Sequence, residues 1–194
     1  MTYPTENTLE GRLIETGGRN GFSSALRGFR VGTQWANLEA ILIASDNDEN
    51  PDASFTEVQE QVRAAGGYGV PVEPLTVTRA ESAVPLVVLM VPWAGEPGSL
   101  DSLCLPAMYA KWPEGKKLLD EFCDSTSVSH WPSVVKQAKL RVQVLLSTMC
   151  RTDPNTTLRY AWSGDGRGEL IPLGHNTFDK IADFIRYFGA LLQA

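Results

Sequence analysis

The sequence is poor in the features that mark membrane, secreted and zinc-binding proteins. No apolar run approaches the roughly 18 residues of a membrane-spanning helix. The first residues, Met-Thr-Tyr-Pro-Thr-Glu-Asn, lack the basic and apolar regions of a signal peptide. Cys104, Cys123 and Cys150 are odd in number and have no CxxC spacing, which argues against a disulfide framework or a zinc site. We therefore expect a cytoplasmic protein with free thiols and no membrane partner.

Excess positive charge and a glycine-rich phosphate loop are also missing. The chain has 17 Lys and Arg against 23 Asp and Glu, a net charge of −6, which disfavours a broad basic surface for DNA. Gly17-Gly18 and Gly66-Gly67 have neither the fingerprint spacing nor the lysine of a P-loop. A nuclease is still compatible with this charge, because a metal held by acidic residues binds phosphate locally.

What the chain does contain is an alternation of apolar strands and amphipathic helices. With 194 residues and 43% hydrophobic content, it is large enough for one cored domain with a helical appendage. Periodicity predicts strands at 38–44 and 84–91 and helices at 22–29, 52–65, 115–122, 133–149 and 177–192, with a helical turn from 100. The order strand, helix, strand predicts an α/β fold, a mostly parallel sheet flanked by helices, with a helical C-terminal third.

Two aspartates follow the first strong strand. The apolar run of residues 38–44 leads into Asp46 and Asp48, beyond the carboxyl end where open α/β sheets place their ligands. A hard cation such as Mg²⁺ would relieve the repulsion between two such carboxylates. The alternative is a solvated turn, since Asp and Asn are common turn residues. Asp101 follows the second strand and would meet Asp46 and Asp48 at one edge of the sheet.

Two lysines lie on the predicted helix 133–149. Lys136 lies well away from its apolar face, and Lys139 lies on the border of that face. Both could simply be solvated. The border position makes Lys139 the better candidate for a side chain that points into a cleft.

Several short motifs, taken in order, resemble a TOPRIM domain. They are Leu13–Asn20 with its GG turn, Ile41–Asp48 with a strand ending in DxD, Gly98–Leu105 with a Gly-x-Leu-acidic turn, and Lys136–Leu140. Together they are most similar to small stand-alone TOPRIM-like proteins related to the nuclease half of the overcoming-lysogenization-defect (OLD) family. The resemblance covers most of residues 11–190. It implies an irregular N-terminus (1–12), a TOPRIM-like core (13–110) and a helical C-terminal extension (111–194).

The resemblance also implies a chemistry. Asp46 and Asp48 would be metal ligands, and Asp101 would take the place of a further acidic ligand. Lys139, or else Lys136, would match a basic residue that contacts the scissile phosphate. The implied function is a Mg²⁺- or Mn²⁺-dependent nuclease acting on nucleic acid, with an ATPase partner protein in phage defence.

One element of the TOPRIM pattern has no counterpart. The family opens with a central strand that ends in a catalytic Glu, whereas Glu6 and Glu10 follow no apolar strand. The start could be truncated, a partner could supply the strand, or the protein could be a degenerate member. A missing central strand would expose hydrogen-bonding edges, which favours a homodimer or a complex.

Other functions fit the sequence less well. A haloacid-dehalogenase phosphatase expects Thr or Val two residues after the second Asp, where Asn50 stands, and places the motif nearer the N-terminus. A glycosyltransferase needs more chain before its DxD. The main alternative is a catalytically degenerate TOPRIM-like interaction subunit without nuclease activity.

Overall fold

The elements alternate as the sequence predicts. A computed structural model describes residues 14, 16, 18–32, 38–80, 84–162 and 169–193, so Glu6, Glu10 and parts of the GG-turn motif lie outside the described residues. The order is η1 (Arg19–Gly21), α1 (Phe22–Val31), β1 (Ile41–Asp46), α2 (Pro51–Ala65), β2 (Leu86–Val91), α3 (Leu100–Lys111), α4 (Pro113–Ser125), η3 (Val128–His130), α5 (Val134–Met149), α6 (Leu158–Ala161), η4 (Asn176–Phe178) and α7 (Asp179–Gln193). The α/β class with a helical C-terminal region is confirmed.

The sheet of the described residues consists of two parallel strands. β1 pairs with β2 from Ile41 opposite Leu86 to Asp46 opposite Val91. Because the pairing is parallel, both strands end at the same edge of the sheet. The loops that follow Asp46 and Val91 therefore begin side by side at this edge. The other side of β2 is covered by the segment before it, where the Leu75 amide donates to the Val88 carbonyl at 2.8 Å.

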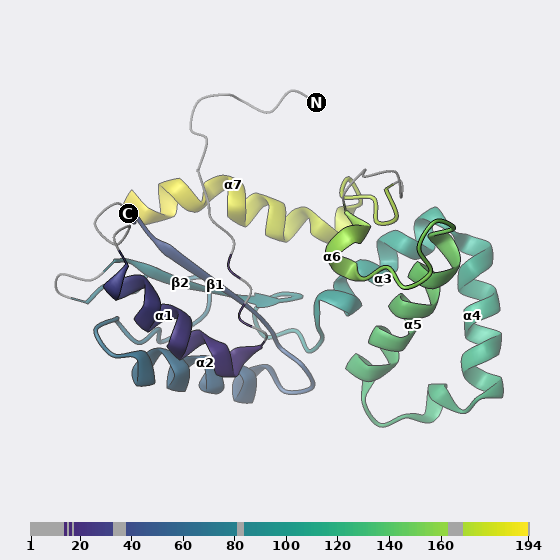
Figure 1. The fold of residues 1–194 in the computed structure, drawn as a ribbon, viewed down its shortest axis with the longest axis horizontal. Helices are drawn as coiled ribbons and strands as arrows, with labels where there is room; N and C mark the ends of the chain where they lie inside the picture. The colour runs from purple at the N-terminus through teal and green to yellow at the C-terminus, as the bar shows by residue number, and fades with distance from the viewer. Residues whose placement is uncertain are drawn as a thin grey trace.

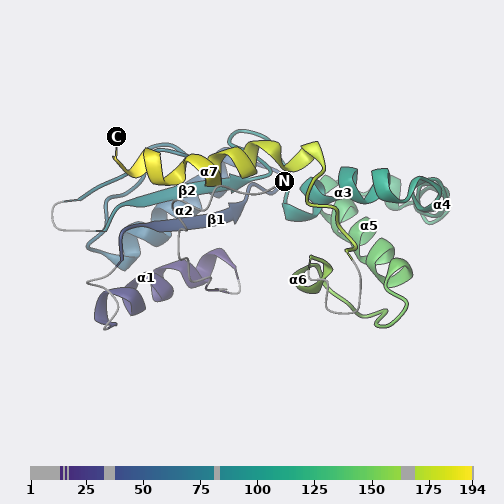
Figure 2. The ribbon, with the colours of Figure 1, turned by 90° about the horizontal axis from the view of Figure 1, so that it is seen from above.

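Helices cover the two faces of the sheet unequally. On one face, β1 and β2 contribute to an apolar cluster with α1 and α2, as expected for residues that alternate along a strand. On the other face lies α7 (Figures 1 and 2), whose Ile181 and Phe184 pack on the cluster that contains Leu89 of β2. Leu42 and Ala44 of β1 share that second face but are exposed.

The helix α1 runs parallel to α2 and in register with it. Successive positions of η1 and α1 contact successive positions of α2 and of Gly66 just after it. The pairs are Arg19 with Glu57, Ser23 with Gln61, Arg27 with the Ala64 carbonyl and Arg30 with the Gly66 carbonyl. Buried Leu26 completes the interface from the apolar side. Because α2 begins just after β1, this register places η1 beside the carboxyl end of β1.

The helical part beside the sheet is built on α3, α4 and α5 (Figure 1). Its apolar cluster includes the three cysteines, all free and buried, as the sequence predicts. Arg141 of α5 donates to Asp120 of α4 at 2.5 Å and to the Tyr109 hydroxyl of α3 at 3.2 Å, which ties the three helices together. None of the helices that the structure describes is long and apolar enough to cross a membrane.

Glu49, in the turn after β1, connects the sheet to α5. Its carboxylate accepts hydrogen bonds from the Ser133 hydroxyl and, at 3.2 Å, from the Val135 amide. Ser133 itself caps α5 by accepting from the Lys136 amide at 3.0 Å. The first turn of α5 is therefore held both by its own cap and by the Glu49 carboxylate from the turn after β1. The negative charge of Glu49 also interacts favourably with the positive end of the helix dipole.

Replacing Glu49 should weaken this connection. We expect Glu49→Ala to lower the free energy of unfolding by about 0.5–1 kcal/mol, because two donors at the start of α5 lose a charged acceptor. Urea denaturation followed by circular dichroism measures the change. Glu60→Ala, which removes an exposed glutamate from α2, is the matched control, and an equal loss in both variants would contradict the expectation.

Candidate functional site

Asp46 is the last residue of β1, and it joins the strand to the start of α3. Its Oδ1 accepts a hydrogen bond from the Leu100 amide at 2.8 Å. Ser99 caps the same helix in a capping box with Ser102, so the first turn of α3 is held by three side chains. This arrangement fixes the position of the Asp46 carboxylate at the edge where both strands end.

Asp101 and Lys139 complete a cluster drawn from three separate elements. Asp101 lies in the first turn of α3, and Lys139 lies on α5, which packs along α3. Lys139, rather than Lys136, is the lysine whose charge acts on both Asp46 and Asp101. Asp46, Asp101 and Lys139, three of the four predicted site residues, therefore lie within electrostatic range of one another.

The two carboxyl groups of this pair are harder to ionise than ordinary aspartates. Burial raises the pKa of Asp46, although the hydrogen bond from Leu100 and the charges of Arg19 and Lys139 oppose the rise. Burial also raises the pKa of Asp101; Lys139 opposes this rise and the neighbouring Asp46 adds to it. The repulsion between the carboxylates is therefore only partly relieved by the protein's own cations.

Asp48 has a different partner. Its carboxylate forms an ion pair with the Arg19 guanidinium, which also pairs with Glu57 of α2. The backbone of Asp48 is fixed in the left-handed region at φ 49°, and its carbonyl accepts from the Gly98 amide at 2.7 Å. Asp48 is thus attached to the loop after β2 and to η1, and its carboxylate already has a cationic partner.

Asn47, between the two aspartates, is a structural residue of the site. It is completely buried, and its Nδ2 donates to the carbonyls of Trp93 and Glu96, each at 2.6 Å. Its own carbonyl accepts from the Ser54 hydroxyl of α2 at 2.6 Å. Asn47 therefore connects the turn after β1 to the loop after β2 and to the first turn of α2.

The predicted ligands fit a metal ion in part. Asp46 and Asp101 are oxygen donors within electrostatic range of each other, and Mg²⁺ typically takes only one or two carboxylates, with waters and phosphate oxygens filling its other positions. Within the described residues, no three or more His, Cys, Asp and Glu side chains form a group that could hold a metal ion. The buried Asn47 Oδ1 has no hydrogen-bond partner in the part of the chain that the structure describes. The donor set is therefore a two-carboxylate site, with Asp48 engaged elsewhere.

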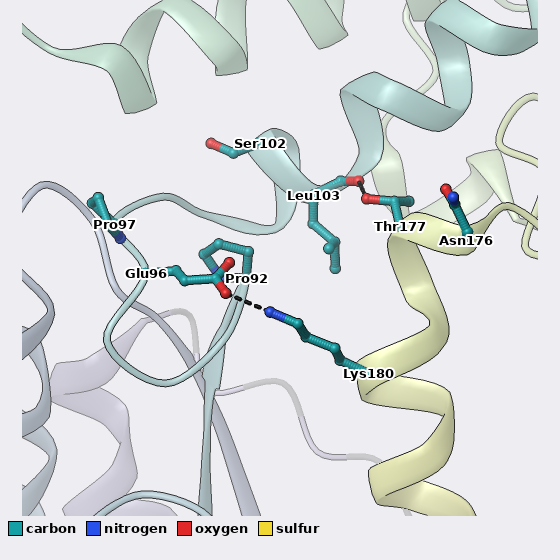
Figure 3. A pocket seen from close by; sticks show the side chains of 8 residues that line it. All are labelled: Pro92, Glu96, Pro97, Ser102, Leu103, Asn176, Thr177 and Lys180. Atoms are coloured by element: carbon teal, nitrogen blue, oxygen red, sulfur yellow. Dashed lines mark hydrogen bonds and ion pairs between the residues drawn. The ribbon is translucent and has the colours of Figure 1, made fainter.

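A pocket of about 400 Å³ lies next to this cluster, between the loop after β2, the start of α3 and the start of α7 (Figure 3). Across it, Lys180 forms an ion pair with Glu96 at 2.5 Å, and Thr177 donates to the Leu103 carbonyl at 3.1 Å. Its lining includes Ser102 and Leu103, which follow Asp101, but none of the predicted site residues. Its cation is thus already paired, and the acidic cluster remains the candidate site.

Sequence reasoning missed four participants: Arg19, Asn47, Glu49 and Glu57. The ion pair of Arg19 with Asp48 depends on how α1 packs on α2, which no local pattern reveals. Asn47 matches an ordinary turn residue in sequence, and only its burial identifies its role. The one available signal was the position of Arg19 directly after Gly17-Gly18, inside the motif that resembles TOPRIM.

The buried amide of Asn47 should contribute strongly to stability. We expect Asn47→Ala to lower the free energy of unfolding by about 2 kcal/mol or more, because the Trp93 and Glu96 carbonyls lose the Asn47 amide as a donor and a cavity forms. Chemical denaturation measures this. Asn155→Ala, at an exposed loop position, should cost little, and comparable losses in the two variants would show that Asn47 has no special role.

Removing the charge of Asp101 should stabilise the fold. The folded-state pKa lies above the ordinary 3.8, so the ionised carboxylate costs stability at pH values above that folded pKa. We expect Asp101→Asn to raise the free energy of unfolding at pH 7, because the variant has no ionised carboxylate to desolvate. The gain should disappear as the pH falls through the folded pKa towards 3.8.

Urea denaturation at pH 7 and at acidic pH measures this dependence. Asp179→Asn is the matched control, because Asp179 is also a first-turn carboxylate but is exposed. It should give no gain, and a loss of stability at pH 7 in Asp101→Asn would contradict the expectation.

Comparison of the chain with protein-family models, with curated proteins and with solved structures finds no match. The resemblance to TOPRIM-like proteins therefore stays a prediction from the motifs in the sequence.

Proposed function

We propose that this protein is a TOPRIM-like, Mg²⁺- or Mn²⁺-dependent phosphodiester hydrolase that acts on nucleic acid. The observation that carries the proposal is the placement of Asp46, Asp101 and Lys139, from β1, α3 and α5, within electrostatic range of one another at the carboxyl edge of a parallel sheet. Two oxygen donors beside one cation supply what phosphoryl chemistry needs, a place for a divalent ion and a counter-charge for the phosphate.

Asp46, Asp101 and Lys139 would have separate roles in the reaction. Asp46 and Asp101 would hold the divalent ion, which when bound supplies charge stabilisation for the phosphate and lowers the pKa of an attacking water. Asp46 stays in place through its bond from the Leu100 amide, and Asp101 is oriented by its place in the first turn of α3. Lys139 is exposed, so its ammonium can reach an anionic phosphate oxygen from the α5 side.

The overall charge of the protein bears on its substrate. With a net charge of −6, the chain has no general attraction for a polyanion, so binding must depend on the local cations and the metal ion. A partner with a basic surface would supply the rest of the contact. The ATPase partner and the role in phage defence implied by the family resemblance belong to this proposal.

A nuclease assay with matched variants tests the proposal. We expect the full chain to cleave DNA or RNA with Mg²⁺ or Mn²⁺ and to lose activity with EDTA. Asp46→Asn keeps an oxygen acceptor for the Leu100 amide but removes the charge, and should reduce cleavage by about 100-fold or more, as should Asp101→Asn.

The lysines provide the second comparison. Lys139→Met should reduce cleavage, whereas Lys136→Met, one turn away on α5, should retain it. Asp179→Asn serves as the control for the Asp→Asn exchange. Cleavage that persists in Asp46→Asn comes from a contaminant or another site, and it would count against the proposal.

A specific observation supports a second function. Asp48 is already paired with Arg19, which suits a degenerate subunit that keeps the fold for binding a larger protein. This alternative predicts no metal-dependent cleavage by the wild type, and an Asp46→Asn variant that binds the partner as the wild type does. Such a result would reject the hydrolase.

A further inference from the structure

The helix α1 carries positive charge in a protein that is acidic as a whole. Residues 16–38 contain Arg19, Arg27 and Arg30 and no Asp or Glu, although the whole chain has 23 acidic against 17 basic residues. Arg27 and Arg30 lie in α1, and both are exposed. Figures 1 and 2 show α1 on the opposite side of the sheet from α7. The structure therefore has one accessible basic helix, at a distance from its acidic residues after β1.

Hydrogen bonds fix both guanidinium groups at the C-terminal end of α2. Arg27 Nη2 donates to the Ala64 carbonyl at 2.8 Å, and Arg30 Nη1 donates to the Gly66 carbonyl at 2.9 Å. Gly67 makes room for Arg30, because a Cβ atom at this glycine would lie 2.5 Å from the guanidinium carbon. The two acceptors are close together in the chain, so the two cations are held near each other.

Neither of these arginines has an acidic partner within the described residues. Arg19, Arg141 and Arg186 each lie beside an Asp or Glu, whereas Arg27 and Arg30 hydrogen-bond with neutral carbonyl groups. One N–H of each guanidinium is used in this way, and the other N–H groups are left for a further acceptor. An anion beside the pair would also reduce the repulsion between the two positive charges.

The surface of α1 next to the arginines is open. Ser24 and Gly28 are exposed, and helical spacing places them on the same side of α1 as Arg27. A Cβ atom at Gly28 would have no other atom within 4 Å. A large ligand can therefore approach this side of the helix closely.

The position of the arginines relative to the acidic site sets the size of such a ligand. η1 lies beside the carboxyl end of β1, and the ten residues of α1 lead away from it over about 15 Å. A strand of nucleic acid advances about 3.4 Å per nucleotide, so about four or five nucleotides would separate the two places. One nucleic acid could therefore reach both.

We propose that Arg27 and Arg30 bind the phosphate backbone of nucleic acid, away from the acidic residues at which cleavage would occur. This inference rests on the proposed action on nucleic acid and adds a second point of contact. Arginine suits the contact, because its planar N–H groups match the geometry of phosphate oxygens. The pair would supply a local attraction for a polyanion that the net charge of −6 does not provide.

Removing both charges should weaken binding in the absence of metal. In fluorescence anisotropy with labelled DNA and RNA duplexes in EDTA, the double variant Arg27→Gln, Arg30→Gln should bind about tenfold more weakly than the wild type. The slope of log affinity against log salt concentration should fall by about two. Arg79→Gln is the matched control, because Arg79 is also exposed and donates to a helix carbonyl, that of Leu192 in α7. It should bind like the wild type.

A charge added beside the arginines tests the same surface and leaves their hydrogen bonds intact. Gly28→Glu should bind the duplexes several-fold more weakly, whereas the neutral Gly28→Gln should bind like the wild type. Gly189→Glu on α7 is the control, because a Cβ atom there also has nothing within 4 Å. Circular dichroism checks the fold of each variant, and the Gly28 pair decides the question should the double arginine variant not fold.

Each outcome decides the inference. Unchanged binding by the folded double variant or by Gly28→Glu overturns it. Tighter binding of labelled polyglutamate than of the duplexes, with the same dependence on the arginines, also overturns it, because the surface would then fit an acidic protein.

The nuclease assay separates this inference from the proposed hydrolase. If the wild type cleaves nucleic acid and the arginine variants bind it as the wild type does, only the inference fails. If the arginine variants bind more weakly as expected and no protein cleaves, only the hydrolase fails. A wild type that neither binds nor cleaves DNA or RNA rejects both.

Discussion

The buried side chain of Asn47 is the contact on which the site depends. It holds the loop after β2 against the turn after β1, and that loop leads directly into α3. The Leu100 amide can reach Asp46, and Asp101 can lie beside it, only while the two segments stay together. Between two aspartates, the uncharged amide of Asn47 joins the two segments through its two buried donor contacts.

The candidate site combines groups with opposing effects on stability. Burial disfavours ionised Asp46 and Asp101, while Lys139 favours the charged form of both and Arg19 that of Asp46. A carboxylate pair that is left partly uncompensated is unfavourable for the fold, and such local costs are common where proteins bind ions or substrates. Asp48 differs from these two aspartates, because its carboxylate already has a cationic partner in Arg19.

Features that depend on local sequence patterns could be predicted, whereas features that depend on packing between distant segments could not. Periodicity located β1, α2, β2 and α5 because each is a local pattern, and the strand followed by Asp46 and Asp48 marked the correct edge of the sheet. Asp101 was assigned by its place after the second strand and Lys139 by its place at the border of the apolar helix face. Both lie within electrostatic range of Asp46, and their roles stay predictions. Arg19 was missed because its partner depends on helix packing. The partial exposure of Leu42 was missed because an apolar strand predicts burial on both faces.

The contact of Glu49 with the start of α5 links the charge balance of the site to the attachment of this helix. The carboxylates belong to the sheet and the first turn of α3, whereas the lysine belongs to a helix whose first turn is attached to the sheet through Glu49. The balance of charge at Asp46 therefore depends on how firmly α5 is held. A protein or nucleic acid that draws the beginning of α5 away from the sheet would also reduce the electrostatic support of the acidic pair.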